Sequence, residues 1–278
     1  MERIQTAIQK AREARRVSDA DKKEQTSAPT PVETLQPEGS PASLKEKLWA
    51  DLPKYKLNPK QLMRARISGH EATTESVSFD VLRTRMMHQM QSNNWCRVAI
   101  ASPGSACGKT TLCLNLAFSF ARQRNTRVIL VDLDLRRPSI HKLLQTGEYH
   151  FAKALEGESQ PEDHIVCYDE KLAFALNSHS VPESAELLQD KDAAHVIDRM
   201  EERYQPDIML FDTPPMLTCD DTYAFLDQID CVLLVAAAEN STAEELEKCK
   251  DEISARCNLL GVVLNKCRYL ETLDKYGY

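Results

Sequence analysis

A loop of small residues between two apolar stretches has the composition of a phosphate-binding site. It follows the apolar run Val98–Ala101 and leads into Gly108, Lys109 and Thr110, which open a stretch with a helical pattern. In a strand–loop–helix of this kind, backbone N–H groups and the positive end of a helix dipole converge on one anion. A lysine at this place reaches the outer phosphates, and the following hydroxyl binds Mg²⁺. The spacing therefore predicts a P-loop built around Lys109 and Thr110.

The predicted nucleotide-binding residues span the loop and the first helical turn. They are Pro103, Gly104, Ser105, Ala106, Cys107, Gly108, Lys109, Thr110 and Thr111. Pro103 stands where the motif has its first glycine, five places before Gly108, so the match to the motif is incomplete. The interpretation therefore depends on other residues that complete a nucleotide site.

Aspartates end two further apolar runs. Asp132 and Asp134 follow Val128–Val131 and lie two residues apart, so in an extended chain both point to the same side. Such a pair near a P-loop can hold a metal-bound water and accept a proton from a nucleophile. Asp212 ends the run Ile208–Phe211, as a Walker B carboxylate does when it reaches Mg²⁺ directly or through water. The alternatives are a loop of solvated charges for the pair and a capping role for Asp212.

Two other polar residues follow apolar runs, and each allows two interpretations. Asn265 ends the run Gly261–Leu264, where its amide could hydrogen-bond the edge of a purine base or simply belong to a turn. Asp221 lies shortly after Asp212 and could join the site or cap a helix.

Short apolar runs alternate with helical segments from Arg97 onward, which predicts an α/β fold of the P-loop NTPase type. We expect a mostly parallel sheet with helices on both faces, because the runs are continuously apolar. The expected strands are Arg97–Ala101, Arg127–Val131, Leu172–Leu176, Asp207–Phe211, Cys231–Ala236 and Gly261–Leu264. Ligands bind at the carboxyl ends of such strands, which is where the motifs above fall.

The ends of the chain differ from this central part. Residues 1–17 read as a basic amphipathic helix, either solvated or docking on a membrane partner or acidic lipid surface. Residues 18–43 read as a disordered linker, so the chain has a flexible N-terminal extension before a domain over 44–278. The C-terminal tail carries Tyr269, Tyr276 and Tyr278 as candidate phosphoacceptors, although tyrosines could also occur there by chance.

Composition excludes several classes of protein. A net charge of −7 over 278 residues argues against nonspecific nucleic-acid binding. No apolar run approaches the roughly 18–20 residues that cross a bilayer, and the first residues lack the apolar core of a secretion signal. Nine scattered cysteines without a C-x-x-C pair fit free thiols in a reducing cytosol.

The motifs together resemble those of the bacterial tyrosine autokinases (BY-kinases), the cytoplasmic kinases of capsule and exopolysaccharide export. The matching segments are Gly108–Thr110, Asp132–Pro138, Asp212–Pro215, Asn265–Lys266 and the tyrosine tail. The resemblance covers the chain from about Val77 to its C-terminus and implies an ATP-dependent protein-tyrosine autokinase.

The resemblance also implies roles for individual residues. Lys109 and Thr110 would bind the phosphates of ATP and Mg²⁺, and Asp134 and Asp212 would support the metal. Asp132 would orient or deprotonate the tyrosine hydroxyl. The implied catalytic set is thus Lys109, Asp132, Asp134 and Asp212, with Thr110, Asp134 and Asp212 as metal ligands.

Partners follow from the same resemblance. Members of the family are activated by a membrane chain-length-determinant (polysaccharide co-polymerase) protein and phosphorylate one another's tails within a ring. We therefore expect self-association and a peripheral place at the inner face of the bacterial plasma membrane. Val77, Asp80 and Arg83 stand where the family's ring-forming helix has Glu, Arg and Arg.

Two other functions remain open. A partition or septum-positioning ATPase would carry a signature lysine four residues before Gly108, but Gly104 stands there. A scaffold that binds nucleotide and controls polymer export without phosphorylating tyrosine would need only the P-loop.

Overall fold

The computed structural model describes residues 41–56 and 58–267. The predicted helix over 1–17, the linker up to residue 40 and the three tail tyrosines lie outside these residues. Helix α2 (Pro41–Asp51) begins within the stretch predicted as a linker, which extends to Ser43. Within the described residues, no helix is both long and apolar enough to cross a membrane.

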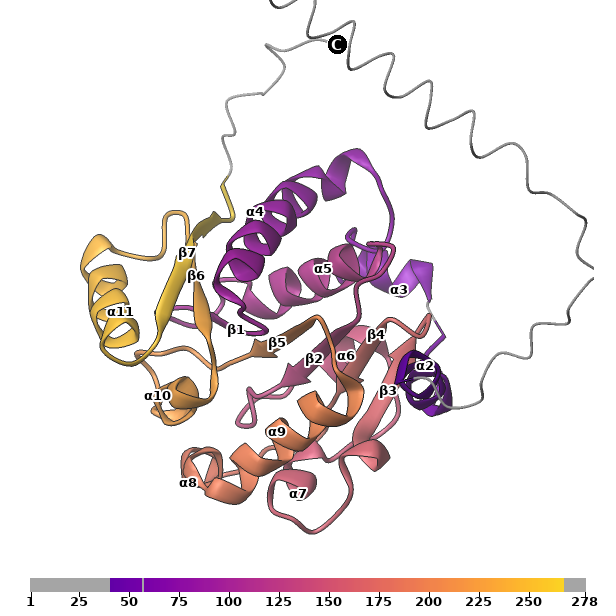
Figure 1. Ribbon diagram of the computed structural model, residues 1–278. Helices are drawn as coiled ribbons and strands as arrows, with labels where there is room; N and C mark the ends of the chain where they lie inside the picture. The colour runs from indigo at the N-terminus through magenta and orange to yellow at the C-terminus, as the bar shows by residue number, and fades with distance from the viewer. Residues whose placement is uncertain (1–40, 57, 268–278) are drawn as a thin grey trace, which may run out of the picture. The chain divides into compact units, whose positions relative to one another are not determined.

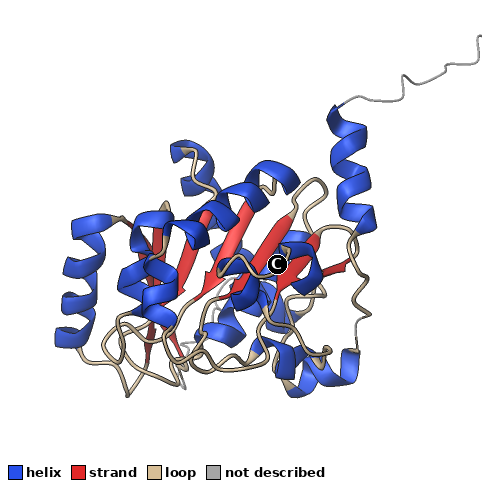
Figure 2. Cartoon of the chain, turned by 90° about the horizontal axis from the view of Figure 1, so that it is seen from below, coloured by secondary structure: helices blue, strands red, loops and turns tan. Residues whose placement is uncertain are grey.

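A seven-stranded sheet forms the centre of the domain, in the order β3-β4-β2-β5-β1-β6-β7 (Figure 2). All neighbouring strands are parallel except β3 and β4. The strands are β1 (Arg97–Ala101), β2 (Val128–Asp132), β3 (Ile165–Tyr168), β4 (Leu172–Ala175), β5 (Ile208–Asp212), β6 (Cys231–Ala237) and β7 (Asn258–Asn265). The predicted α/β fold with a mostly parallel sheet is confirmed.

Helices cover both faces of this sheet, and each face has its own apolar cluster. Figure 1 shows α4 and α5 on one side of the strands and α7, α8 and α9 on the other. The remaining helices have these bounds: α3 (Pro59–Arg64), α4 (Val77–Asn93), α5 (Lys109–Ala121), α6 (Ile140–Leu144), α7 (Phe151–Leu155), α8 (Ser184–Gln189), α9 (Lys191–Tyr204), α10 (Asp221–Phe225) and α11 (Ala243–Arg256). Alternate residues of β1 show the division, since Val98 and Ile100 join the cluster of α5 while Ala99 and Ala101 join that of α9.

Strand β3 is the one strand of the described sheet that the sequence did not predict. It pairs antiparallel with β4 through a tight turn in which Asp169 and Glu170 both have positive φ, at 50° and 53°. The Lys171 N–H donates to the Tyr168 carbonyl (3.2 Å), which closes the turn. Turns of this shape usually contain Asn or Gly, so the pair Asp-Glu gave no signal for a hairpin.

Helix α5, which begins at Lys109, is fixed by a buried asparagine. The side-chain oxygen of Asn115 accepts from the backbone N–H groups of Ser68 (2.8 Å) and Gly69 (2.9 Å). Its amide nitrogen donates to the carbonyls of Arg66 (3.0 Å) and Thr111 (2.8 Å). Asn115 therefore ties the segment before α4 to the middle of the helix that carries the predicted phosphate-binding lysine.

Candidate functional site

The loop between β1 and α5 has the backbone that a phosphate cradle requires. Gly108 has φ of 88°, a left-handed conformation that favours glycine, and Ala106 has φ of 58°. A Cβ atom on Gly108 would lie 2.5 Å from the side-chain nitrogen of Asn265. Both conformation and space therefore require glycine at this position.

The lysine of the loop is held by a neighbouring serine. Lys109 is 7% exposed, and its Nζ donates to Ser102 Oγ (2.9 Å). Ser102 Oγ in turn donates to the Gly104 carbonyl (2.7 Å). This bond keeps the ammonium group at the loop, where a phosphate could replace the hydroxyl as its acceptor.

Backbone hydrogen bonds join this loop to the segment after β5. The Met216 N–H donates to the Ser102 carbonyl (2.8 Å), and the Leu217 N–H donates to the Pro103 carbonyl (3.0 Å). Thr213 Oγ1 donates to the Ile100 carbonyl (3.0 Å). The phosphate-binding loop and the loop that follows Asp212 therefore form one rigid unit.

Asp132 and Asp212 occupy the last positions of adjacent strands β2 and β5 and are register partners there. Both are fully buried. The Oδ2 atom of Asp132 accepts from the Ile140 N–H (3.4 Å), while Asp132 Oδ1 and both carboxylate oxygens of Asp212 have no hydrogen-bond partner among the described residues. Three of the four carboxylate oxygens of this buried pair thus lack a hydrogen-bond partner among the described residues.

Burial shifts the acid–base properties of this pair. Burial is the main cause that raises the pKa of Asp212 to about 7. Thr110 and Lys109 lower this pKa, and the charge of Asp134 raises it. Burial, followed by the negative charge of Asp212, raises the pKa of Asp132 well above its usual value. Asp134, Lys109 and Thr110 therefore lie close enough to Asp212 to influence its charge, and Asp212 and Asp134 influence that of Asp132.

Asp134 is the most accessible of the three carboxylates. It is half-buried, and burial raises its pKa. Its Oδ1 atom accepts from the backbone N–H of Arg137 (3.1 Å), which fixes the side chain at the start of the loop after β2.

These residues fit a hard divalent cation. Buried polar oxygens are nearly always hydrogen-bonded, so the unpartnered oxygens of Asp212 indicate that a cation or solvent completes the site. Carboxylate and hydroxyl oxygens are the protein ligands that Mg²⁺ prefers, together with phosphate and water. Thr110, Asp134 and Asp212 would hold the ion. Within residues 41–56 and 58–267, no three His, Cys, Asp or Glu side chains are arranged as a metal site.

A cavity of about 740 Å³ lies against this group. Of the predicted nucleotide-binding residues, it is lined by Ser105, Ala106, Gly108, Lys109, Thr110 and Thr111. Asp134 also lines it, whereas Asp132, Asp212, Pro103, Gly104 and Cys107 do not. The Cys107 thiol is buried and lies 3.3 Å from the Gly104 carbonyl.

Several residues of the cavity were not predicted from the sequence. They are Arg136, Arg137, Ser139, Lys142, Leu143, Pro214, Pro215, Thr218 and Cys219. Some of them follow Asp134 or Asp212 directly, so the loop after each acidic strand end was the available signal. The α6 residues carried no such signal, because only the fold brings that helix to the cavity.

Asn265 contacts the phosphate-binding loop rather than the cavity. Its Nδ2 atom donates to the Cys107 carbonyl (2.9 Å), and its Oδ1 atom accepts from the Lys266 N–H (2.8 Å). Its contact with a purine base stays a prediction, and what the structure shows is a brace between β7 and the loop.

Asp221 binds a neighbouring arginine instead of taking either predicted role. It is fully buried and accepts from Arg136 Nε (2.7 Å) and from Ser184 Oγ (2.8 Å). Helix α10 begins at Asp221 itself, so Asp220 occupies the N-cap position. Asp221 therefore fixes Arg136, which lines the cavity.

The helix expected to mediate ring formation uses its charged residues within the chain. Asp80 on α4 accepts from Arg83 (3.0 Å) and from Arg122 and Ser119 at the end of α5. Arg83 also donates to the Ser119 carbonyl (3.1 Å). An aspartate at position 80 thus ties α4 to α5, while Val77 remains 52% exposed.

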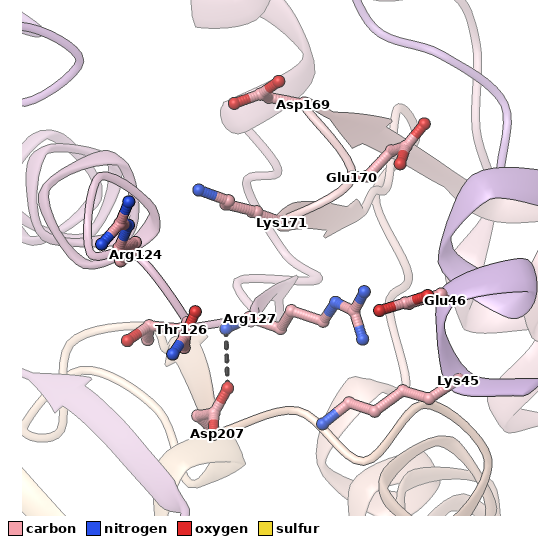
Figure 3. Close-up of a pocket in the computed structure, with 10 residues that line it drawn as sticks. Lys45, Glu46, Arg124, Thr126, Arg127, Asp169, Glu170, Lys171 and Asp207 are labelled. Atoms are coloured by element: carbon pink, nitrogen blue, oxygen red, sulfur yellow. Dashed lines mark hydrogen bonds between the residues drawn. The ribbon is translucent and has the colours of Figure 1, made fainter. Parts of the chain in front are cut away.

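A second cavity, shown in Figure 3, lies where strands β2, β4 and β5 begin, at the end of the sheet opposite Asp132 and Asp212. Its charged residues are Lys45, Glu46, Arg124, Arg127, Asp169, Glu170, Lys171 and Asp207. Basic and acidic groups are equal in number there. Figure 3 shows the guanidinium of Arg127 pointing toward Glu46, and the Arg127 N–H donates to Asp207 (2.7 Å). The lining of this cavity therefore has no excess of positive charge, which a phosphate site needs.

Comparison with known proteins agrees with this geometry. The sequence pattern of the family described as "CobQ/CobB/MinD/ParA nucleotide binding domain" matches residues 98–275. The tyrosine-protein kinase YwqD of Bacillus subtilis is 29% identical over 206 residues, which cover 73% of this chain and 85% of that protein.

Solved structures share the fold. The kinase domain of the Escherichia coli tyrosine kinase ETK superposes with a TM-score of 0.68 at 23% identity, covering 82% of this chain and 88% of that one. The septum site-determining protein MinD of Pyrococcus horikoshii, complexed with Mg-ADP, gives a TM-score of 0.54 at 22% identity over 63% of this chain and 72% of its own.

Proposed function

The chain belongs to the CobQ/CobB/MinD/ParA nucleotide binding domain family, and we propose that within it this protein is an ATP-dependent protein-tyrosine autokinase that regulates exopolysaccharide or capsule polymerisation and export. The observation that carries the proposal is the pair of buried carboxylates, Asp132 and Asp212, at adjacent strand ends beside the loop of Lys109. The similarity to a named tyrosine-protein kinase supports the choice among the functions of this family.

The proposed reaction transfers the γ-phosphoryl group of ATP to a tyrosine. The phenolic oxygen attacks the γ-phosphorus, the bond from that phosphorus to the β,γ-bridging oxygen breaks, ADP leaves, and the phenolic proton passes to a carboxylate. Lys109 and the loop amides hold the phosphates, since positioning and charge neutralisation supply most of the catalysis in phosphoryl transfer. Mg²⁺, when bound, neutralises charge on the β- and γ-phosphates.

Asp132 is the carboxylate proposed to orient the tyrosine hydroxyl or accept its proton. Burial and the neighbouring charge of Asp212 raise its pKa, which makes it a better proton acceptor than an exposed aspartate. Asp134 lines the cavity and is proposed, with Thr110 and Asp212, to hold the metal. Asp132→Asn should therefore lower turnover while sparing Mg²⁺ and ATP affinity, and Asp134→Asn should weaken Mg²⁺ affinity.

Partners and location are proposed from the family likeness. A membrane chain-length-determinant protein would activate the kinase and hold it at the inner face of the plasma membrane, and a second copy would supply the tyrosine tail. Because Asp80 and Arg83 bind α5 of their own chain, self-association would use other contacts than those two side chains.

One experiment separates this function from its rivals. Purified protein is incubated with Mg-ATP beside Lys109→Met, and phosphotyrosine, ADP release and ATP binding are measured together. Phosphotyrosine that disappears in the variant supports the kinase. ADP release without phosphotyrosine would instead support a partition-type switch, and binding without either product would support a scaffold.

A further inference from the structure

The cavity beside the phosphate-binding loop contains positive charge that the protein itself does not neutralise. Four basic residues line it: Lys109, Arg136, Arg137 and Lys142. Lys109 is held by Ser102 near two carboxylates, and Arg136 is paired with Asp221 (2.7 Å) and Asp220 (3.5 Å). Arg137 and Lys142 are both exposed and form no ion pair with the described residues.

The backbone holds both of these residues in place. The Arg137 N–H donates to the side chain and to the carbonyl of Asp134, each at 3.1 Å. The Lys142 N–H donates to the Ser139 carbonyl (3.1 Å). The carbonyl of the next residue, Leu143, accepts from Gln61 Nε2 on α3 (3.0 Å). These bonds fix the backbone from which both side chains extend, and both residues line the cavity.

The same cavity offers a surface for an aromatic ring. Leu143, Pro214 and Pro215 line it together with Asp134 and the loop residues. A tyrosine needs an apolar surface for its ring and a polar site for its hydroxyl. The cavity thus has the elements of an acceptor site, with two free basic groups at its edge.

We propose that Arg137 and Lys142 select the acceptor, and that they recognise a segment with a carboxylate two positions from the tyrosine. The occupant is the C-terminal segment 268–278 of a second copy of this chain. In that segment Glu271 follows Tyr269 by two positions, and Asp274 precedes Tyr276 by two. Residues two apart in an extended chain point to the same side, about 7 Å apart, so tyrosine and carboxylate enter the site together. This inference rests on the proposed kinase function.

The contrast with the cavity of Figure 3 supports this assignment. There the lining contains as many acidic as basic residues, four of each, and Arg127 points toward Glu46. The nucleotide cavity is lined by four basic residues and by one carboxylate, that of Asp134, so an occupant with a carboxylate would complement Arg137 and Lys142.

The test uses the full chain with Tyr269, Tyr276 and Tyr278 changed to Phe, so that it phosphorylates only an added peptide of residues 268–278. Arg137→Glu with Lys142→Glu should raise the KM for this peptide about tenfold, since an exposed ion pair contributes up to about fivefold and reversal adds repulsion. The urea midpoint of unfolding should match that of the parent protein, which shows that the variant is folded. Lys153→Glu, an exposed charge on α7 away from the cavity, is the matched control and should change neither value.

A second arm changes the peptide. Changing Glu271→Gln and Asp274→Asn in the peptide should raise its KM with the parent enzyme. The same peptide change should raise the KM little further with the double charge-reversal variant, because that variant has already lost the interaction. Equal peptide KM values for parent and charge-reversal enzyme would overturn the acceptor assignment and leave the kinase intact. Absence of phosphotyrosine on every peptide and on the full chain would overturn both.

Discussion

Asp132 and Asp212 are register partners at the ends of strands β2 and β5, and both side chains are fully buried. Burial, followed by the charge of Asp212, raises the pKa of Asp132, and burial chiefly raises the pKa of Asp212 to about 7. Charged carboxylates that are buried without partners destabilise a fold. Their burial at adjacent strand ends is therefore expected to lower the stability of the metal-free protein.

Removing one of these charges should stabilise the metal-free protein. Because the folded-state pKa of Asp212 lies above that of an exposed aspartate, its ionisation opposes folding increasingly as pH rises from about 4 to about 7, and the full penalty is present above that range. Asp212→Asn should raise the free energy of unfolding at pH 8 by roughly 2–4 kcal/mol and abolish Mg²⁺-dependent phosphorylation. Denaturant titration in EDTA measures the first effect. A less stable variant would contradict the burial argument.

Gly108 should not tolerate a side chain. Gly108→Ala would place Cβ 2.5 Å from the amide of Asn265 on a backbone with φ of 88°. We expect a loss of about 1–3 kcal/mol in stability and a large loss of ATP affinity, measured by calorimetry. Gly261→Ala on β7, where a Cβ meets nothing within 4 Å, is the control and should leave both unchanged. Normal ATP affinity in Gly108→Ala would contradict the cradle geometry.

The hydrogen bonds of buried Asn115 should contribute strongly to the stability of the fold. Asn115→Leu leaves the N–H groups of Ser68 and Gly69 without their acceptor, which should cost about 2–4 kcal/mol in urea unfolding. Gly69→Ala should be similarly harmful, because its Cβ would lie 2.1 Å from the Asn115 carbonyl oxygen. Exposed Asn240→Leu serves as control. Losses below about 0.5 kcal/mol in both buried variants would show that the segment before α4 adapts.

His164 should make the free energy of unfolding depend on pH. His164 Nδ1 accepts the His150 N–H (3.1 Å) and His164 Nε2 lies 2.8 Å from Ser159 Oγ, so the ring is held neutral. Burial lowers its pKa from 6.5, the charges of His150 and Lys153 lower it further, and the charge of Asp163 opposes the shift. The unfolded chain then binds the proton more readily than the folded chain. The contribution of neutral His164 to the free energy of unfolding is therefore complete above pH 6.5 and is lost as pH falls below that value.

His164→Asn isolates this effect, because the asparagine oxygen can accept the same N–H without titrating. The difference in unfolding free energy between the parent protein and the variant should be constant from pH 7.5 to 8.5 and should shrink as pH falls toward about 5.5. A difference that does not change across the whole range would show that His164 is not held neutral.

The order of strands and motifs along the chain was sufficient to predict the α/β fold and the meeting of Lys109, Asp134 and Asp212 at one end of the sheet. Parallel strands bring their carboxyl ends to one edge whatever their loops contain. What pattern alone could not provide were contacts made by side chains after folding. Tertiary packing decides that Lys142 of α6 reaches the cavity and that Asp221 binds Arg136. The hairpin turn at Asp169 contains residues without a strong local preference for such a turn.

The most direct test of the account is phosphorylation in trans. Lys109→Met, which keeps its tyrosines, is mixed with the Tyr269→Phe, Tyr276→Phe, Tyr278→Phe protein, which keeps its P-loop, and Mg-ATP is added. The account predicts phosphotyrosine on residues 269, 276 or 278 of the Lys109→Met chain in the mixture, located by mass spectrometry, and none on either protein alone. A mixture without phosphotyrosine, while the unmodified protein still binds ATP, would contradict the assignment of a tyrosine kinase.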